Sequence, residues 1–307
     1  MIDYVIKTKD LTKQYHKQLA ADKVNIHIRK GTIYGLLGRN GAGKTTIMKM
    51  LLGLTPISSG EAEVFGQNVR QGGRKIYPRI GAIIESPGFY PNLTATENLT
   101  IFAKLRGTSR PDAVKRALDV VGLPYKDKKL FSSFSIGMKQ RLGIARAIMH
   151  DPELLILDEP VNGLDPIGIS EIRGFLQQLS REQGKTILIS SHILSEIDLM
   201  ADDVGIIHNG KLLEENSMKE LKRKNQKYIL FRVSSTASAA RILERQFAQA
   251  GYRVEDDTVI RIYDTEINLG AVNKAFITNG IDVFESKTCD ESLEDYFKEI
   301  TGGVGIA

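Results

Sequence analysis

The chain has 307 residues, of which 42% are hydrophobic and 26% are charged, and its formal net charge is +5. The length fits about two domains, and the composition is that of an ordinary globular protein. The single cysteine, Cys289, excludes a disulfide framework and a Cys-rich metal site. No run of about 18 uncharged apolar residues occurs, so we expect no membrane-spanning helix. The amino terminus, MIDYVIKTKD, has no apolar core of signal-peptide length, so we expect no secretory leader.

Short apolar runs alternate with helix-like segments as far as about Asn209. Because these runs consist almost entirely of Ile, Leu and Val, they indicate strands buried on both faces, as in a parallel sheet between helices. We therefore predict an α/β fold with strands at Ile33–Leu37, Ile80–Ile84, Leu154–Leu157, Thr186–Ser190 and Val204–His208. The part at about 86–150 is mostly helical in pattern, and we interpret it as a helical subdomain inserted into the α/β core.

The pattern changes after the polar stretch KELKRKNQKY. We place a domain boundary there, with one domain at 1–221 and a smaller α+β domain at 222–307. The second domain shows the order β-α-β-β-α-β, with a hairpin around Asp256 and Asp257, which is the ferredoxin-like pattern. No motif assigns it a chemistry. It suits either a regulatory module or a passive cap that stabilises a dimer, and we favour the cap.

The stretch GRNGAGKT, Gly38–Thr45, matches G-x-x-x-x-G-K-[ST] between a predicted strand and a predicted helix. Glycines let the backbone wrap closely around phosphates, and successive N–H groups form an anion nest. Lys44 would neutralise the β- and γ-phosphates, and the Thr45 hydroxyl would bind Mg²⁺. The alternative is a flexible turn followed by Lys-Thr by chance, which the strand–loop–helix context disfavours. The residues predicted to contact the nucleotide are Gly38, Arg39, Asn40, Gly41, Ala42, Gly43, Lys44, Thr45 and Thr46.

The stretch LLILDEP is a buried strand that ends in Asp158 and Glu159. Such folds bind ligands at the carboxyl ends of their strands. Asp158 would hold Mg²⁺, and Glu159 would be the general base that polarises the attacking water. Two solvated acids at a strand end are the alternative, which is weaker beside a phosphate loop.

The stretch FSIGMKQRLG places Ser135 and Gly137 at the start of an amphipathic helix. A Ser hydroxyl and free N–H groups at a helix N-terminus form a second anion site. One chain already has its own phosphate loop, so this site is best used on the nucleotide of another subunit. Read alone, Ser135 is simply an N-cap.

With these motifs in this order, about the first 215 residues resemble the nucleotide-binding domain of an ATP-binding cassette (ABC) transporter. FSIGM stands where that family has Leu-Ser-Gly-Gly-Gln. The resemblance implies that Tyr15 stacks on adenine, that Asp165 lies in a loop crossing the dimer interface, and that His192 contacts the γ-phosphate. Without the resemblance, a strand Tyr is more often packing and a lone His more often structural.

The family architecture implies a head-to-tail homodimer that forms on ATP binding. Each ATP would lie between the Lys44 loop of one subunit and the turn Ser135, Gly137 and Met138 of the other. The motion would drive a separate membrane permease, so the protein is expected in the cytoplasm, peripheral on the inner face of the cell membrane.

The chain departs from the family pattern in two segments. Glu85 stands where most members have a Gln, and Ile136 and Met138 replace a Gly and the Gln of the signature. Since Ser135 and Gly137 are kept, we expect ATPase activity. A carboxylate suits a hard cation, so Glu85 is interpreted as a third Mg²⁺ residue rather than as a solvated strand end.

The Glu together with S-x-G-M-K-Q-R-L resembles the branch of ABC ATPases that protects Gram-positive bacteria from antimicrobial peptides. That branch includes lantibiotic immunity systems and bacitracin exporters. The stretches GFYPNLTATENL, PVNGLDPIGI, SSHILSEI and ESLEDYFKEITGG are similar to the bacitracin-resistance ATPases. The predicted function is therefore the ATPase of a peptide-antibiotic exporter, with bacitracin favoured over a lantibiotic.

Two other classes compete with this prediction. The net charge of +5 fits a soluble ABC ATPase acting on nucleic acid or ribosomes. Such proteins usually carry two cassettes or a long coiled coil, and neither is seen, so we expect no direct nucleic-acid partner. In a P-loop kinase, the Ser135–Gly137 turn and His192 would have no obvious use.

Overall fold

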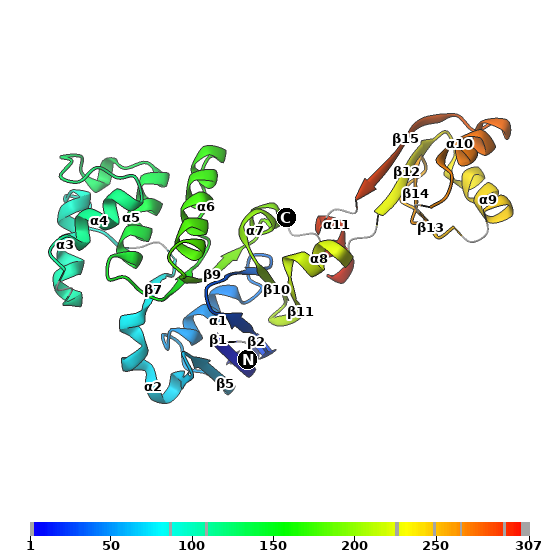
Figure 1. Cartoon of the computed structure of the whole chain (residues 1–307). Helices are drawn as coiled ribbons and strands as arrows, with labels where there is room; N and C mark the ends of the chain where they lie inside the picture. The colour runs from blue at the N-terminus through cyan, green and yellow to red at the C-terminus, as the bar shows by residue number, and fades with distance from the viewer. Residues whose placement is uncertain are drawn as a thin grey trace. The chain divides into compact units, whose positions relative to one another are not determined.

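The computed structural model describes residues 3–85, 88–107, 110–224, 227–247, 250–264, 266–290 and 293–301 (Figure 1). The chain divides into two compact units, one ending at Met218 and the other beginning at Lys219. The predicted boundary after Leu221 falls inside helix α8 (Met218–Lys224), because the polar stretch at which we placed the boundary begins as a helix.

A six-stranded sheet forms the centre of the first unit, in the order β11-β10-β4-β9-β8-β7. Its five neighbouring strands from β10 to β7 are parallel, and β11 pairs antiparallel at one edge. Every residue of β4, β8 and β9 is buried, as their apolar composition predicts. The strand bounds are β4 (Ile33–Leu37), β7 (Ile80–Ile83), β8 (Leu154–Leu157), β9 (Thr186–Ser191), β10 (Asp203–His208) and β11 (Lys211–Ser217).

A second, antiparallel sheet was not predicted. Its longest strand has the sequence YVIKTKDLTKQY, in which exposed Lys, Asp and Gln interrupt the buried residues, so it lacks the apolar run by which the other strands were found. Helix α1 (Lys44–Leu51) contributes buried residues to a core shared by both sheets. The strands are β1 (Tyr4–Tyr15), β2 (Gln18–Val24), β3 (His27–Arg29), β5 (Ser59–Val64) and β6 (Gln67–Asn68).

The predicted helical subdomain contains α3 (Ala95–Arg106), α4 (Ala113–Val120) and α5 (Ile136–Ile148), which pack on one another (Figure 1). Its predicted first residue, Ser86, lies outside the described residues. Helix α5 also packs on β7, so closely that a Cβ at Gly81 would lie 2.1 Å from the Ala147 carbonyl oxygen. The other helices of this unit are α2 (Val69–Ile76), α6 (Pro166–Arg181) and α7 (Leu194–Met200), with short 3₁₀ turns at Tyr77–Arg79 and Phe131–Ser133.

The second unit has the predicted ferredoxin-like fold. Its antiparallel sheet has the order β13-β14-β12-β15. The Phe231 ring of β12 packs edge-on against the Phe276 ring of α10, with the ring centroids 5.2 Å apart. The elements are β12 (Lys227–Val233), α9 (Thr236–Gln246), β13 (Tyr252–Val254), β14 (Val259–Ile262), α10 (Leu269–Thr278), β15 (Val283–Asp290) and α11 (Leu293–Ile300). Within the described ranges of both units, no helix is long and apolar enough to cross a membrane.

Candidate active site

The loop between β4 and α1 lies at the carboxyl edge of the parallel sheet and forms one wall of a cavity. Gly41 and Gly43 have φ angles of +81° and +107°, which L side chains rarely adopt. A Cβ at Gly43 would lie only 2.2 Å from the Ala20 carbonyl oxygen. The glycine at this position is therefore required by both backbone angle and space.

The cavity has a volume of about 450 Å³, within the range of small-molecule sites. Seven of the predicted loop residues line it. Gly38 and Ala42 instead support the loop, since the Gly38 carbonyl accepts a hydrogen bond from Lys44 Nζ and the Ala42 carbonyl accepts one from the Gly210 N–H. The lining consists of Arg39, Asn40, Gly41, Gly43, Lys44, Thr45 and Thr46, together with Gln18, Leu19, Ala20, Glu159, Asn209 and Gly210.

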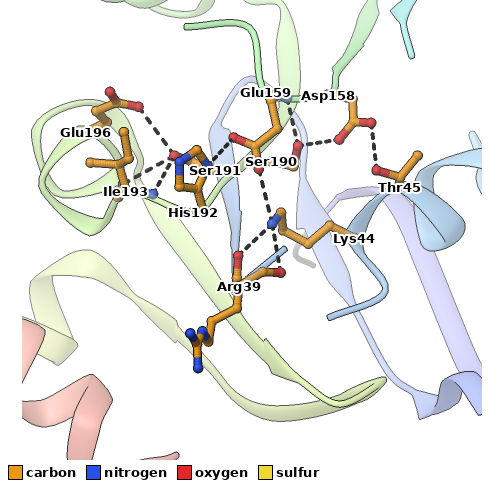
Figure 2. Close-up of polar contacts among 11 residues, drawn as sticks. Arg39, Lys44, Thr45, Asp158, Glu159, Ser190, Ser191, His192, Ile193 and Glu196 are labelled. Atoms are coloured by element: carbon orange, nitrogen blue, oxygen red, sulfur yellow. Dashed lines mark hydrogen bonds and ion pairs between the residues drawn. The ribbon is translucent and has the colours of Figure 1, made fainter. Parts of the chain in front are cut away.

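Lys44 is buried at the first position of α1 and points back over the loop (Figure 2). Its Nζ atom donates to the carbonyl oxygens of Gly38 at 2.5 Å and Arg39 at 3.2 Å. It also lies 3.1 Å from Glu159 Oε1. This ammonium group therefore lies directly beside the loop, where phosphates would need neutralisation.

Asp158, which is 9% exposed, is held by hydroxyl groups from two segments. Thr45 Oγ1 donates to its Oδ2 at 2.7 Å, and Ser190 Oγ donates to its Oδ1 at 2.6 Å (Figure 2). The predicted pair Thr45 and Asp158 is thus brought together. A carboxylate and a hydroxyl are oxygen ligands of the kind that Mg²⁺ takes, so the residues present fit that ion.

Ser190 is a site residue that the sequence interpretation missed. Besides bonding Asp158, its Oγ accepts a hydrogen bond from the Glu159 N–H at 2.8 Å. The sequence did contain a signal for Ser190, because this residue ends the predicted strand at Thr186–Ser190 and adjacent parallel strands end at one sheet edge. The residue types alone did not distinguish it from Ser191.

Glu159 and His192 also meet. Glu159 follows β8 with a left-handed φ of +47°, and its Oε2 lies 2.8 Å from His192 Nδ1 (Figure 2). The segment that carries His192 is fixed by Ser191, whose Oγ accepts from the Ile193 N–H at 2.9 Å and lies 3.3 Å from Glu196 Oε2. Burial raises the pKa of the Glu196 carboxyl. The Glu159 carboxylate thus lies between two groups, with the Lys44 ammonium at its Oε1 and the His192 imidazole at its Oε2.

Two predicted residues lie outside the cavity lining. Tyr15 ends β1 and is 45% exposed, and Lys13 Nζ lies over its ring, 4.7 Å from the ring centroid. Glu85 is two-thirds exposed, and its Oε1 forms an ion pair with Lys49 Nζ at 2.6 Å. In the described part of the chain, no hydrogen bond or ion pair joins Glu85 to Thr45 or Asp158.

The signature residues lie at the N-terminus of α5, away from this cavity. Ser135 is the N-cap, and its Oγ accepts from the Met138 N–H at 3.2 Å. Asp165 caps α6 in the same way, accepting from the Gly168 N–H at 2.8 Å. The two turns are neighbours, since an ideal Cβ at Gly137 would lie 3.5 Å from Leu164 Cδ2.

The double role of Ser190 generates a prediction. In Ser190→Ala, the buried Asp158 Oδ1 loses its donor and the Glu159 N–H loses its acceptor. Hydrogen bonds to charged groups contribute about 1.5–3 kcal/mol, so we expect the ATP hydrolysis that the motifs predict to fall about ten-fold or more. Steady-state phosphate release would be compared with Ser170→Ala, a substitution at an exposed position of α6. Equal rates for the two variants would contradict the role.

Comparison with known proteins identifies the family. Residues 21–162 match the family model described as ABC transporter. The chain is 53% identical to the bacitracin transport ATP-binding protein BcrA of Enterococcus faecalis, over 100% of this chain and 99% of that protein. It is 52% identical to the BcrA protein of Bacillus licheniformis, over 97% and 98% of the two chains. The lantibiotic transport ATP-binding protein SrtF of Streptococcus pyogenes is 46% identical over 69% of this chain and 90% of that protein.

Solved structures agree with the family model. An ATP-binding subunit of an ABC transporter superposes with a TM-score of 0.64 at 30% identity, over 72% of this chain and 92% of that chain. The CbiO1 subunit from Clostridium perfringens superposes with a TM-score of 0.65 at 26% identity, over 80% and 97%. The chain therefore belongs to the ATP-binding proteins of ABC transporters, enzymes that bind and hydrolyse ATP.

Proposed function

We propose that this chain is the ATPase of an exporter that removes a peptide antibiotic, bacitracin in the first place, through a separate membrane permease. The observation that carries the proposal is the 53% identity over the whole chain to a protein named for bacitracin transport. The lantibiotic relative supports the second candidate, lantibiotic immunity, over only 69% of the chain. On this reading residues 1–221 are the ATPase domain and 222–307 are an accessory domain.

In the proposed mechanism, Glu159 is the general base. Its carboxylate is held from both sides, by Lys44 at 3.1 Å and by His192 at 2.8 Å. Phosphates entering the loop would compete with Glu159 for Lys44, which leaves the carboxylate available to accept a proton from water. His192 would keep Glu159 oriented through their 2.8 Å contact, and it is proposed to contact the γ-phosphate.

Thr45 and Asp158 are the residues that would hold Mg²⁺, and Glu85 is proposed to lie near them. The ion supplies positive charge that offsets the charge of the β- and γ-phosphates. The Asp158 carboxylate is held in place by the hydrogen bonds that it accepts from the Thr45 and Ser190 hydroxyls. Tyr15 is proposed to cover the adenine, because it precedes by three residues Gln18, which lines the cavity.

The proposed active form is a homodimer that closes on ATP. Ser135, Gly137 and Met138 do not line the cavity of their own chain. Their helix N-terminus is a ready anion site, so they would act on the ATP of the partner subunit. Asp165 lies beside them, in the loop whose Leu164 approaches Gly137.

A groove of about 580 Å³ is the proposed docking surface for the permease. Its lining is mainly apolar, and no acidic residue is among the described lining residues. Two guanidinium groups face it, from Arg106 and Arg146. The Arg146 guanidinium stacks on the rings of Phe102 at 4.9 Å and Phe89 at 5.5 Å, and burial together with Arg106 lowers its pKa.

Neither arginine is ion-paired with a carboxylate of the described chain. An apolar permease segment that carries an Asp or Glu would supply the missing charge. Ile80 and Ala82 of β7 line the same groove, and β7 leads to Glu85. Docking of the permease in the groove would therefore be transmitted along β7 to the ATP site. The protein would then sit on the inner face of the membrane without contacting nucleic acid.

Growth inhibition tests the proposed function. A sensitive Gram-positive host would carry this gene with its neighbouring permease genes and be challenged with bacitracin and with nisin. We expect protection against bacitracin that Lys44→Ala abolishes, because phosphate binding is lost. Protection against nisin alone would establish lantibiotic immunity in its place. Protection against neither would overturn both.

The docking groove gives a separate prediction. Arg146→Met keeps most of the side-chain volume and removes the charge, so we expect permease-dependent recovery in membranes to fall about ten-fold, as for a lost buried charge pair. Binding of ATP by the purified subunit should be unchanged. Arg116→Met, on the exposed surface of α4, is the matched control. Full membrane recovery of Arg146→Met would contradict this surface.

A further inference from the structure

Helix α1 presents two polar side chains toward carboxylates on one face. Thr45 and Lys49 are four residues apart, so they lie one above the other, about 6 Å apart along the helix axis. Thr45 bonds Asp158, and Lys49 Nζ donates to Glu85 Oε1 at 2.6 Å. One helix face thus fixes two carboxylates that come from the ends of the neighbouring strands β8 and β7.

The electrostatics of Lys49 agree with this placement. The hydrogen bond that Lys49 donates to Glu85 is the largest cause that raises the pKa of Lys49, against the lowering effect of partial burial. Asp158 contributes to the same rise. The negative charges of both Glu85 and Asp158 therefore act on Lys49.

The backbone of Glu85 has an unusual conformation. Its φ of +59° is left-handed, a strained conformation for a residue with a side chain. Such a conformation persists where the surroundings hold it. The Glu85 side chain is 67% exposed, and the ion pair with Lys49 is the contact that ties its carboxylate to helix α1.

We propose that Lys49 is the positioning residue that allows a carboxylate, rather than a neutral side chain, to be accommodated at position 85. It fixes the direction of the Glu85 side chain beside the Thr45–Asp158 pair and offsets its negative charge. A third carboxylate can then lie near the phosphates of ATP without repelling them. A neutral glutamine at this position would need no such partner. The inference rests on the ATPase function proposed above and deepens it.

Removal of Lys49 should act on substrate affinity more than on the chemical step. In Lys49→Gln, Glu85 keeps its charge but loses both its tether and its counter-charge, so it repels the nucleotide and competes for Mg²⁺. We expect the KM for MgATP to rise about two- to five-fold, the scale of a partly exposed ion pair. The kcat should change less, and the Mg²⁺ concentration for half-maximal rate should shift in the same variant.

The test is a double-mutant cycle on the full-length protein with KM, kcat and Mg²⁺ titrations. Lys49→Gln, Glu85→Gln and the double variant would be compared with the wild type. Because Lys49 acts through Glu85, the Lys49→Gln substitution should raise the KM in the wild-type background but not in the Glu85→Gln background. Lys49→Arg should retain the wild-type KM for MgATP, which separates the effect of the charge from an effect on helix stability. Lys104→Gln, an exposed lysine of α3, is the matched control.

The outcomes are distinct. A Lys49→Gln substitution that raises the KM as much in the Glu85→Gln background as in the wild type would overturn the role of Lys49. So would a Lys49→Gln variant with the KM and Mg²⁺ dependence of Lys104→Gln. Equilibrium binding of a fluorescent ATP analogue with and without Mg²⁺ gives the same cycle independently of turnover. Wild-type protein that binds ATP but does not hydrolyse it would count against the proposed function, and the binding cycle would still decide on Lys49.

Discussion

The carboxylate of Glu159 is shared between two groups that come from distant parts of the chain, Lys44 of the phosphate loop and His192 after β9. This contact ties the three strand ends β4, β8 and β9 to one point. It exists because the parallel sheet brings its carboxyl ends to one edge, and because the glycine-rich loop turns Lys44 back toward that edge. Any change that separates these strand ends would separate base, cation and imidazole together.

The surrounding charges follow from the same constraint. Three carboxylates, Glu85, Asp158 and Glu159, end two adjacent strands, and like charges so placed would repel one another and the phosphates. Each has a partner: Lys49 for Glu85, two hydroxyls for Asp158, and Lys44 with His192 for Glu159. Three of these partners, Lys44, Thr45 and Lys49, lie on α1, whose first turn also forms the phosphate loop. Movement of this helix on nucleotide binding would therefore reach all three carboxylates.

Much of this could be predicted from sequence, for reasons that are local. The phosphate loop, the strand ending at Asp158 and the strand before His192 each lie within one short stretch, where apolar runs and fixed spacing indicate both element and role. The ferredoxin-like order of the second unit was readable in the same way and is confirmed. The antiparallel sheet containing β1 was missed because its polar residues interrupt the apolar pattern.

The remaining features depend on direction in space. Ser190 and Ser191 are adjacent in sequence, and only the fold shows that the first bonds Asp158 while the second bonds the Ile193 N–H. The spacing of Thr45 and Lys49 was visible, but the left-handed turn at Glu85 that brings its carboxylate to Lys49 was not. The roles of Tyr15, Glu85 and the signature turn stay predictions, since each needs a nucleotide, an ion or a second subunit.

The most direct test of the account is single-turnover ATP hydrolysis by Glu159→Gln. The amide keeps the shape of the side chain but cannot act as a base, and loss of a general base costs about 10²–10⁴-fold in rate. The account predicts a fall on that scale, with ATP still bound through the Lys44 loop. Hydrolysis at the wild-type rate, with binding intact, would show that Glu159 is not the base and that the shared carboxylate serves only to hold the strand ends together.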